Sequence, residues 1–185
     1  EITGFTTPTW DGHSFTGFYD KNDPTAEGAK KYYGAAGTSY TKWDKADTEV
    51  TLYPGWDNAT YTIEYDTNGG NFADDYVRQY TFGQGATLPD SNYVKKSGCS
   101  FQGWYKDSTF SGEPVTESGK AEFGDKKFYA KWQDNEKHTL TLDSQGAGAP
   151  TTQDVAEDAL ITKPADPVIT DNKFAGWYTA STGGT

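Results

Sequence analysis

The sequence predicts a mainly β protein with little helix (α+β), built from small units in tandem. Aromatic residues make up 16% of the chain although all hydrophobic residues together reach only 34%. The 21 glycines and 8 prolines indicate many short strands joined by turns. One aromatic pattern also recurs along the 185 residues, a length that suits one or two domains or several small repeated ones.

The composition excludes several classes of protein. A net charge of −11 without a basic stripe argues against DNA or RNA as a partner, because phosphate binding needs clustered Lys and Arg. No apolar run is long enough to span a membrane, and no leader-type segment opens the sequence. The single cysteine, Cys99, permits no intramolecular disulfide and no zinc site. We expect no cofactor and no catalytic or metal-binding residue.

Three sequence motifs repeat in a fixed order. The first, called the opener, alternates in hydrophobicity; the second, the centre, has the pattern F-x-G-[WF]-Y; and the third, the closer, is an aromatic strand motif. The centres are Phe15–Tyr19, Phe101–Tyr105 and Phe174–Tyr178. The openers are Tyr61–Asp66 and His138–Asp143, and the closers are Leu52–Trp56 and Phe128–Trp132. Their order predicts one complete copy between two partial ones.

These motifs divide the chain into three units. Residues 61–132 form the complete copy, 1–56 the later part of a copy with a longer middle segment, and 138–185 the earlier part of another. The joints, 57–60 and 133–137, are short and polar, which predicts a semi-rigid rod of neighbouring repeats. We expect each partial copy to be incomplete in isolation and the parent gene to continue on both sides.

In the complete copy, alternation over 61–65 predicts a half-buried strand. Asn68-Gly69 is a strong hairpin signal, because both positions tolerate positive φ. Tyr76, Tyr80 and Phe82 then fall on one face of a returning strand.

The second half of the complete copy predicts two further strands, over 100–105 and 127–132. Between Pro89 and Gly98 we expect a short helix. Aromatic rings bury large areas, which a unit of this size needs, so the tryptophans are predicted to pack in the cores. These are Trp56, Trp104, Trp132 and Trp177.

The motifs of the complete copy resemble the Listeria–Bacteroides repeat, the B-repeat of internalin-type bacterial surface proteins. The opener reads Tyr-Thr-Ile-Glu-Tyr-Asp-Thr-Asn-Gly-Gly over 61–70, the centre Ser-Gly-Cys-Ser-Phe-Gln-Gly-Trp-Tyr over 97–105, and the closer Lys-Phe-Tyr-Ala-Lys-Trp over 127–132. The resemblance implies small β-grasp (ubiquitin-like) modules with antiparallel or mixed sheets. It also implies an extracellular place, on the cell surface or cell wall, and a non-catalytic role.

Two copies depart from the pattern. The first has Trp10-Asp11-Gly12 where the family places a basic residue, and its middle segment, 19–43, is longer. The third replaces the Asn-Gly-Gly turn with Ser-Gln-Gly-Ala over 144–147, so we expect its hairpin to differ. Despite these departures, the resemblance still implies the fold of the family. It does not imply which partner this chain binds.

Catalysis and calcium binding are the weaker readings. His13, His138 and Cys99 stand at repeat positions that change chemical type between copies, which favours a structural role. Two acidic clusters offer oxygens, but neither fits an EF-hand loop, and solvated turns are favoured. The clusters comprise Asp20, Asp23, Asp66, Asn68, Asp74 and Asp75.

Four rings outside the common pattern, Trp10, Tyr32, Tyr33 and Trp43, are the candidate ligand contacts. They either form an exposed aromatic patch for a sugar or pack the insertion of the first copy. The leading hypothesis is a non-enzymatic spacer or stalk of a bacterial surface protein, with adhesion to a host protein or glycan. The alternative is a carbohydrate-binding module of a secreted or surface polysaccharide-handling protein, and an enzyme fragment is a distant third.

Overall fold

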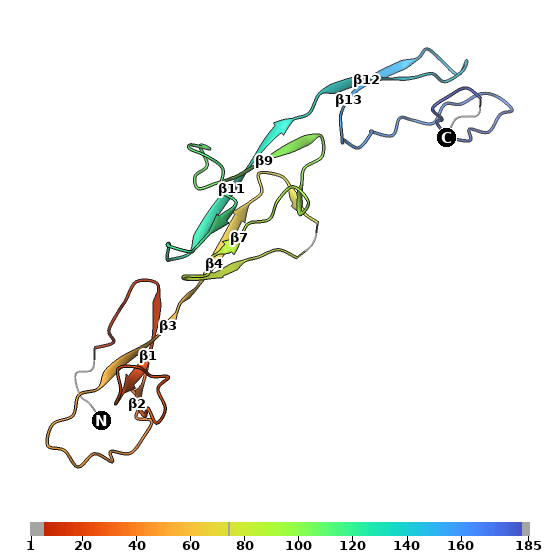
Figure 1. Ribbon diagram of the computed structural model, residues 1–185. Helices are drawn as coiled ribbons and strands as arrows, with labels where there is room; N and C mark the ends of the chain where they lie inside the picture. The colour runs from red at the N-terminus through yellow and green to blue at the C-terminus, as the bar shows by residue number, and fades with distance from the viewer. Residues whose placement is uncertain (1–5, 74, 183–185) are drawn as a thin grey trace.

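The computed structural model describes residues 6–73 and 75–182 and contains three successive units, each built on a β-sheet. Figure 1 shows them following one another along an elongated molecule. In the described residues all regular structure is β, and no helix is present. The first sheet has the order β2-β1-β3, from β1 (His13–Tyr19), β2 (Lys31–Gly34) and β3 (Tyr53–Asn58).

The middle unit contains a four-stranded mixed sheet of order β6-β4-β11-β9. Its strands are β4 (Thr60–Asp66), β6 (Gln79–Thr81), β9 (Cys99–Tyr105) and β11 (Lys126–Asp134). The two central strands, β4 and β11, run parallel, while both outer pairs are antiparallel. Two short ladders complete the unit. They join β5 (Asn71–Phe72) to β8 (Val94–Lys95) and β7 (Ala86–Thr87) to β10 (Glu117–Ser118).

The third unit contains a single antiparallel hairpin within the described residues. Its strands are β12 (Lys137–Leu142) and β13 (Thr151–Ala156). The segment around Phe174–Tyr178 lies beside this hairpin without forming a strand. The openers and the two closers therefore form strands as predicted, whereas the third centre does not.

The core of the middle unit surrounds Trp104, whose side chain is 1% exposed. Its indole Nε1 donates a hydrogen bond to the Pro89 carbonyl at 2.6 Å. Phe128 and Ala130 of β11 are fully buried beside it, and Trp132 packs partly buried against the same cluster. The predicted core role of Trp104 is confirmed, and burial of each such ring stabilises the fold by roughly 1.5–3 kcal/mol.

The F-x-G-W-Y pattern encodes a β-bulge. In β9, Phe101 pairs with Trp132 and Gly103 with Lys131, so the residue between them has no partner on β11. Gly103 has φ of 118°, and a Cβ there would lie 2.6 Å from Cβ of Pro114, which is why the position needs glycine. The bulge places Phe101 and Trp104 on one face, with ring centroids 5.3 Å apart.

The short helix expected between Pro89 and Gly98 is absent. One hydrogen-bonded turn forms there, in which the amides of Tyr93 and Val94 donate to the Asp90 carbonyl. The Asp90 side chain accepts from the amide of Asn92, a local bond that competes with helix formation. The chain then pairs as β8 with β5, which ends the turn.

The Asn68-Gly69 turn has the expected backbone, with φ of 47° and 85°. The prediction that it closes a tight hairpin is wrong. The strand after it, β5, pairs with β8, and the partner of β4 begins only at Gln79. Asn68 Nδ2 donates to the Ala130 carbonyl at 2.7 Å, which directs the turn across β11. Of the three aromatic residues predicted on the returning strand, only Tyr80 lies in β6, and Tyr76 and Phe82 lie outside it.

The turn of the third copy is conserved in geometry despite its different sequence. Gln145 has φ of 48°, and its amide donates to the Asp143 carboxylate at 2.8 Å. The amide of Asn68 makes the same bond to Asp66 at 3.0 Å. The aspartate, present in both copies, imposes the same local bond. The hairpins nevertheless differ as expected, because β12 pairs with β13 over its whole length whereas β4 pairs with β6 only over Thr60–Thr62.

Candidate functional site

The junctions between neighbouring units are the first candidate site, since a tandem chain acts through the way its units are joined. At the first junction Ala59 is the only residue between β3 and β4, and its side chain is buried. Its amide donates back to the Gly12 carbonyl of the first unit at 2.9 Å. Its carbonyl accepts forward from the amide of Phe82 in the middle unit at 2.9 Å. One residue thus binds both units through its backbone.

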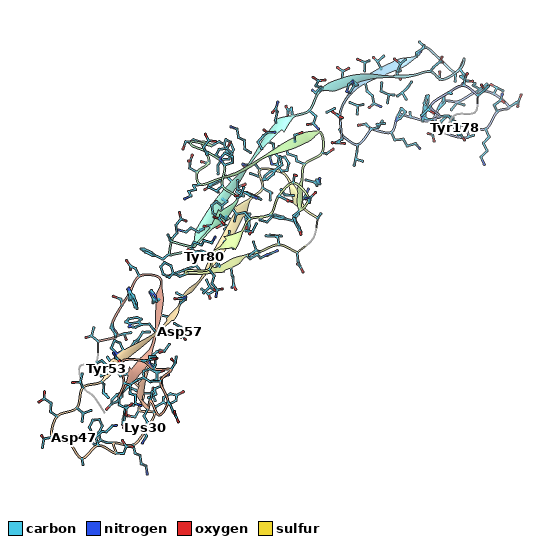
Figure 2. All side chains as sticks on the ribbon, in the orientation of Figure 1. Lys30, Asp47, Tyr53, Asp57, Tyr80 and Tyr178 are labelled. Atoms are coloured by element: carbon cyan, nitrogen blue, oxygen red, sulfur yellow. The ribbon has the colours of Figure 1, made fainter. Side chains whose placement is uncertain are left out.

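Gly12 is fitted to this junction. Its φ is 79°, and a Cβ at this position would lie 2.7 Å from the ring of Phe82. Figure 2 shows how close the two units are here, with Asp57 near the end of the first sheet and Tyr80 in the middle one. The missing side chain therefore allows the middle unit to pack directly on the turn before β1.

The second junction repeats this arrangement with one extra residue. The amide of Asn135 donates back to the Gly98 carbonyl at 3.0 Å, and the Glu136 carbonyl accepts forward from the amide of Glu157 at 2.9 Å. The Asn135 side chain accepts from Ser100 Oγ at 2.6 Å and donates to the Glu157 carbonyl at 2.9 Å. The backward and forward backbone bonds that Ala59 makes alone are thus divided between Asn135 and Glu136. The Asn135 side chain adds further hydrogen bonds to both units.

Gly98 packs at the second junction as Gly12 does at the first. A Cβ on Gly98, whose φ is 69°, would lie 3.1 Å from Cβ of Ala156 and 3.3 Å from Cβ of Ala159. The amide of Leu160 also donates to Ser97 Oγ at 3.3 Å. Both junctions therefore use the turn before the centre as the surface on which the next unit packs.

The same turn recurs in all three copies. A bridge closes it between Trp10 and His13, between Lys96 and Cys99, and between Ile169 and Asn172. The third residue has positive φ in each: 79° at Gly12, 69° at Gly98 and 62° at Asp171. Sequence reasoning missed this function, although a glycine three residues before the first Phe of the centre signals it in two copies.

Trp10, one of the four candidate ligand contacts, lies at the first junction. Its ring stacks on His13 with centroids 3.7 Å apart and meets the edge of Trp56 at 5.7 Å. His13 in turn contacts the ring of Phe82 at 5.2 Å. Trp10 remains 54% exposed, so it covers the junction while presenting one surface to solvent.

The other three candidates lie at the far end of β1. Tyr32 is only 1% exposed, and its ring lies 5.5 Å from Trp43, which is 56% exposed. Tyr33 is half-buried and pairs with Phe18 across the sheet. The structure brings Tyr32 and Trp43 together but places Trp10 apart from them, so the four do not form one continuous surface.

Ionic contacts hold the segment after Trp43 against the sheet. Asp44 accepts hydrogen bonds from Lys30 Nζ and from the Tyr32 hydroxyl, which lower its pKa to about 2. Lys45 Nζ lies 2.6 Å from the Asp20 carboxylate, and this bond lowers the pKa of Asp20. These contacts join Asp44 and Lys45 to residues of the longer middle segment. They support the interpretation that the aromatic residues there pack the insertion.

The histidines and the cysteine do not form a catalytic group. His13 Nδ1 bonds to the Asp11 carbonyl at 2.9 Å within its own turn, and His138 is exposed on β12. Desolvation and the neighbouring Asp134 raise the pKa of the Cys99 thiol, which lowers its thiolate fraction. Across residues 6–73 and 75–182, no three metal-ligating side chains of the His, Cys, Asp or Glu type gather in one place.

The carboxylates considered for calcium are engaged in local turns. Asp23 accepts from the amide of Thr25 at 2.8 Å, and Asp66 accepts from the amide of Asn68. Asp74 lies outside the described residues, and its neighbour Asp75 is exposed.

No helix in the described part of the chain has the length and apolar character needed to cross a membrane.

A family model matches most of the chain. It describes the Listeria-Bacteroides repeat domain and covers residues 61–131 and 138–185. The chain belongs to this family. The matched ranges contain most of the mixed sheet of the middle unit and most of the hairpin of the third, together with the third centre.

The first unit lies outside the matched ranges but repeats the pairing of the middle one. Phe15 pairs with Trp56 and Gly17 with Gly55 across β1 and β3, with a bulge between. These are the counterparts of the Phe101–Trp132 and Gly103–Lys131 pairs. The strand carrying the centre and the closing strand thus meet in the same register in both units.

Curated relatives agree with the family. A protein of Evansella cellulosilytica named "Putative membrane protein" is 30% identical over 94% of this chain, and "Putative Gly-rich membrane protein" of the same organism is 28% identical over 91%. Internalin H of Listeria monocytogenes is 30% identical over 68%. The chain spans 24%, 18% and 21% of these three relatives, respectively. No solved structure matches the chain.

Proposed function

We propose that the chain is a non-enzymatic spacer segment of a bacterial cell-surface protein, one that holds other parts of that protein at a distance from the cell. Membership of the Listeria-Bacteroides repeat family supports this, as do relatives named as membrane proteins and as an internalin. Attachment at the cell wall and contact with a host protein or glycan belong to the same proposal.

The observation that carries the proposal is the equivalence of the two junctions. Each links its units by a backbone bond to the carbonyl of Gly12 or Gly98 and by direct packing on that glycine. A joint of one or two residues fixed on both sides leaves little room for bending. An extended, stiff chain is the physical requirement of a spacer.

We further propose that each complete copy is a β-grasp module and that the modules divide at 1–56, 61–132 and 138–185. In the middle unit the opening strand β4 and the closing strand β11 lie parallel at the centre, flanked by β6 and β9. This order, second-first-fourth-third, is the β-grasp order without its helix. The short joints between the sheets support the division.

Interspin distance measurements test the spacer role. Labels at Lys42→Cys and Glu113→Cys, in a Cys99→Ser background, lie on exposed positions of the first and middle units. A stiff junction gives a narrow distance distribution, and Gly12→Ala should broaden it, because the new methyl meets the ring of Phe82. A broad distribution in the unaltered chain would refute the spacer role.

Gly112→Ala is the matched control for that experiment. Gly112 has φ of 76°, close to that of Gly12, but a Cβ there has no neighbour within 4 Å. Both variants carry the same backbone strain, and only Gly12→Ala disturbs a junction. The control should leave the distribution narrow.

A second role, carbohydrate binding, is favoured by the exposure of Trp43 beside Tyr32. A glycan array with the chain and with Trp43→Ala tests it. Binding that is lost in the variant would support a sugar contact at Trp43. Uniform absence of binding would remove the carbohydrate reading and leave the spacer role intact.

A further inference from the structure

In the middle unit, the strand that receives the chain from the first unit lies beside the strand that passes it to the third. β4 begins at Thr60, directly after the joint at Ala59, and β11 ends at Asp134, directly before the joint at Asn135. The two strands pair in parallel at the centre of the sheet. Figure 1 shows both strands running along the length of the molecule. Tension carried along the chain therefore enters at one end of this pair and leaves at the opposite end.

This arrangement decides how tension acts on the pair. A pull toward the first unit acts on the start of β4, and a pull toward the third unit acts on the end of β11. Because the strands are parallel neighbours, the two pulls slide them past each other along their own direction. The hydrogen bonds between them lie across that direction, so they are stretched together. A sheet that is opened from one end breaks its bonds in succession, at a lower force.

Side chains extend this ladder of hydrogen bonds beyond both ends of the backbone pairing. The backbone pairing covers four residues of each strand. At the start, the amide of Thr62 donates to the Asp125 carboxylate at 2.8 Å. At the end, Asn68 Nδ2 donates to the Ala130 carbonyl at 2.7 Å. More bonds therefore share the tension than the two strands alone provide.

Trp132 adds a further bond at the same end. Its indole Nε1 donates to the Thr67 carbonyl at 2.8 Å, which links the closing strand to the turn after β4. A Cβ on Gly70 would lie 2.5 Å from the ring of Trp132, so glycine is needed there for the ring to approach. Lys127 Nζ lies 2.6 Å from the Glu64 carboxylate, an ion pair between directly opposite residues of the two strands. The opener and the closer of the repeat thus meet in one set of contacts.

We infer that the β4–β11 pair and these side-chain bonds form a mechanical clamp, which keeps the middle unit folded when the chain is under tension. The inference deepens the proposed spacer role and rests on it for the source of the tension, since a spacer transmits any pull on the parts that it holds. The clamp gives the opener turn and the closing tryptophan a function. Stiffness is a property of the junctions, whereas the clamp is a property of the middle sheet, so each can fail without the other.

The test pulls on the whole chain in two directions by single-molecule force spectroscopy, in a Cys99→Ser background. Handles at Thr60→Cys and Gln133→Cys pull the pair from opposite ends and place only the middle unit under tension. Handles at Thr60→Cys and Phe123→Cys pull it from one end, because Phe123 precedes β11 at the end where β4 begins. All three attachment positions are exposed. The unfolding force should be at least about threefold higher for opposite ends, since forced unfolding follows the unfolding rate in the direction of pulling.

Two variants locate the resistance to force. Trp132→Phe keeps an aromatic ring but removes the indole bond between the sliding segments, so it should lower the force for opposite ends and leave the force for one end unchanged. Tyr80→Phe is the matched control, because the bond that it removes, to the Gly124 carbonyl, lies off the β4–β11 pair. It should lower the force for opposite ends less than Trp132→Phe does. Equal forces in the two directions, which need neither variant to fold, would overturn the inference, and so would equal losses from the two variants.

The force measurement and the interspin measurement separate the two proposals. A narrow interspin distribution with equal forces in the two directions would refute the clamp and support the spacer role. A broad interspin distribution with a higher force for opposite ends would refute the spacer role and support the clamp as a property of the middle sheet.

Discussion

The middle and third units carry the same centre motif but bury it to very different extents. The ring pair Phe101–Trp104 has centroids 5.3 Å apart at 66°, and Phe174–Trp177 has them 5.5 Å apart at 65°. The local motif thus forms in both units. The tryptophan of the motif is fully buried only in the middle unit, where Trp104 lies against β11. The motif sets the local geometry, and the closing strand supplies the core.

The largest expected effect contrasts the two tryptophans directly. Trp104→Ala removes a fully buried ring and the bond to Pro89, so it should reduce the free energy of unfolding of the middle unit by about 3–5 kcal/mol. Trp177→Ala, beside the open groove between β12 and the third centre, should cost no more than about 1 kcal/mol. Urea denaturation combined with hydrogen exchange resolved by unit measures both.

Equal losses from the two alanine variants would contradict this comparison, since they would mean that the third unit has a packed core of its own. Phe128→Ala serves as a second middle-unit variant, because it removes a buried ring from the closing strand without touching the centre. It should destabilise the middle unit by a similar amount and leave exchange in the third unit unchanged.

The glycine of the centre gives the next largest contrast. Gly103→Ala adds a methyl 2.6 Å from Pro114 at φ of 118° and should cost about 2–4 kcal/mol. Gly176 has φ of 145°, but its nearest neighbour, Tyr178, is 3.6 Å away. Gly176→Ala should therefore cost only the backbone part, about 1–2 kcal/mol. The change in denaturation midpoint tests both, and a larger loss at Gly176 would reverse the comparison.

These contrasts also show what the sequence alone could predict. Alternation located β4 and the aromatic closers located β3 and β11, because these features are local. The fold class was right about β structure and wrong about the helix near Asp90, where a side-chain bond to the amide of Asn92 competes with helix formation. The hairpin after Asn68 was wrong because the partner of that turn is Ala130, far along the chain.

The candidate site was harder to predict for the same reason. Recurrence of the centre identified Phe101, Trp104 and Gly103 as a set, but not the bulge that they form. The bonds of Ala59 to Gly12 and Phe82 join three separate segments, and no local pattern encodes them. Tyr32 looked available as a ligand contact because its burial depends on the later segment that carries Trp43 and Asp44.

Two tyrosines within the middle unit sharpen the comparison between satisfied and unsatisfied polar groups. The Tyr80 hydroxyl donates to the Gly124 carbonyl at 2.6 Å, so Tyr80→Phe should cost about 1 kcal/mol. The Tyr65 hydroxyl is buried without a partner in the described structure, and burial raises its pKa. Tyr65→Phe should be neutral or stabilise by up to about 1 kcal/mol. Thermal unfolding of the paired variants measures the difference, and destabilisation by Tyr65→Phe would reveal a bond to the hydroxyl.

The smallest expected effect is a dependence on acid in the middle unit that the third lacks. Asp107 accepts hydrogen bonds from Ser111 and Thr109, which lower its pKa to about 2, whereas the third copy has Ala180 at the corresponding position. A carboxyl whose pKa is lowered on folding stabilises the fold above its unfolded value, and that contribution disappears as the pH falls from about 4 to about 2. Asp107→Asn should therefore flatten the loss of stability of the middle unit over this range. Amide exchange at Thr109, measured against pH, follows the local bond, and an unchanged profile in the variant would show that Asp107 contributes nothing to acid sensitivity.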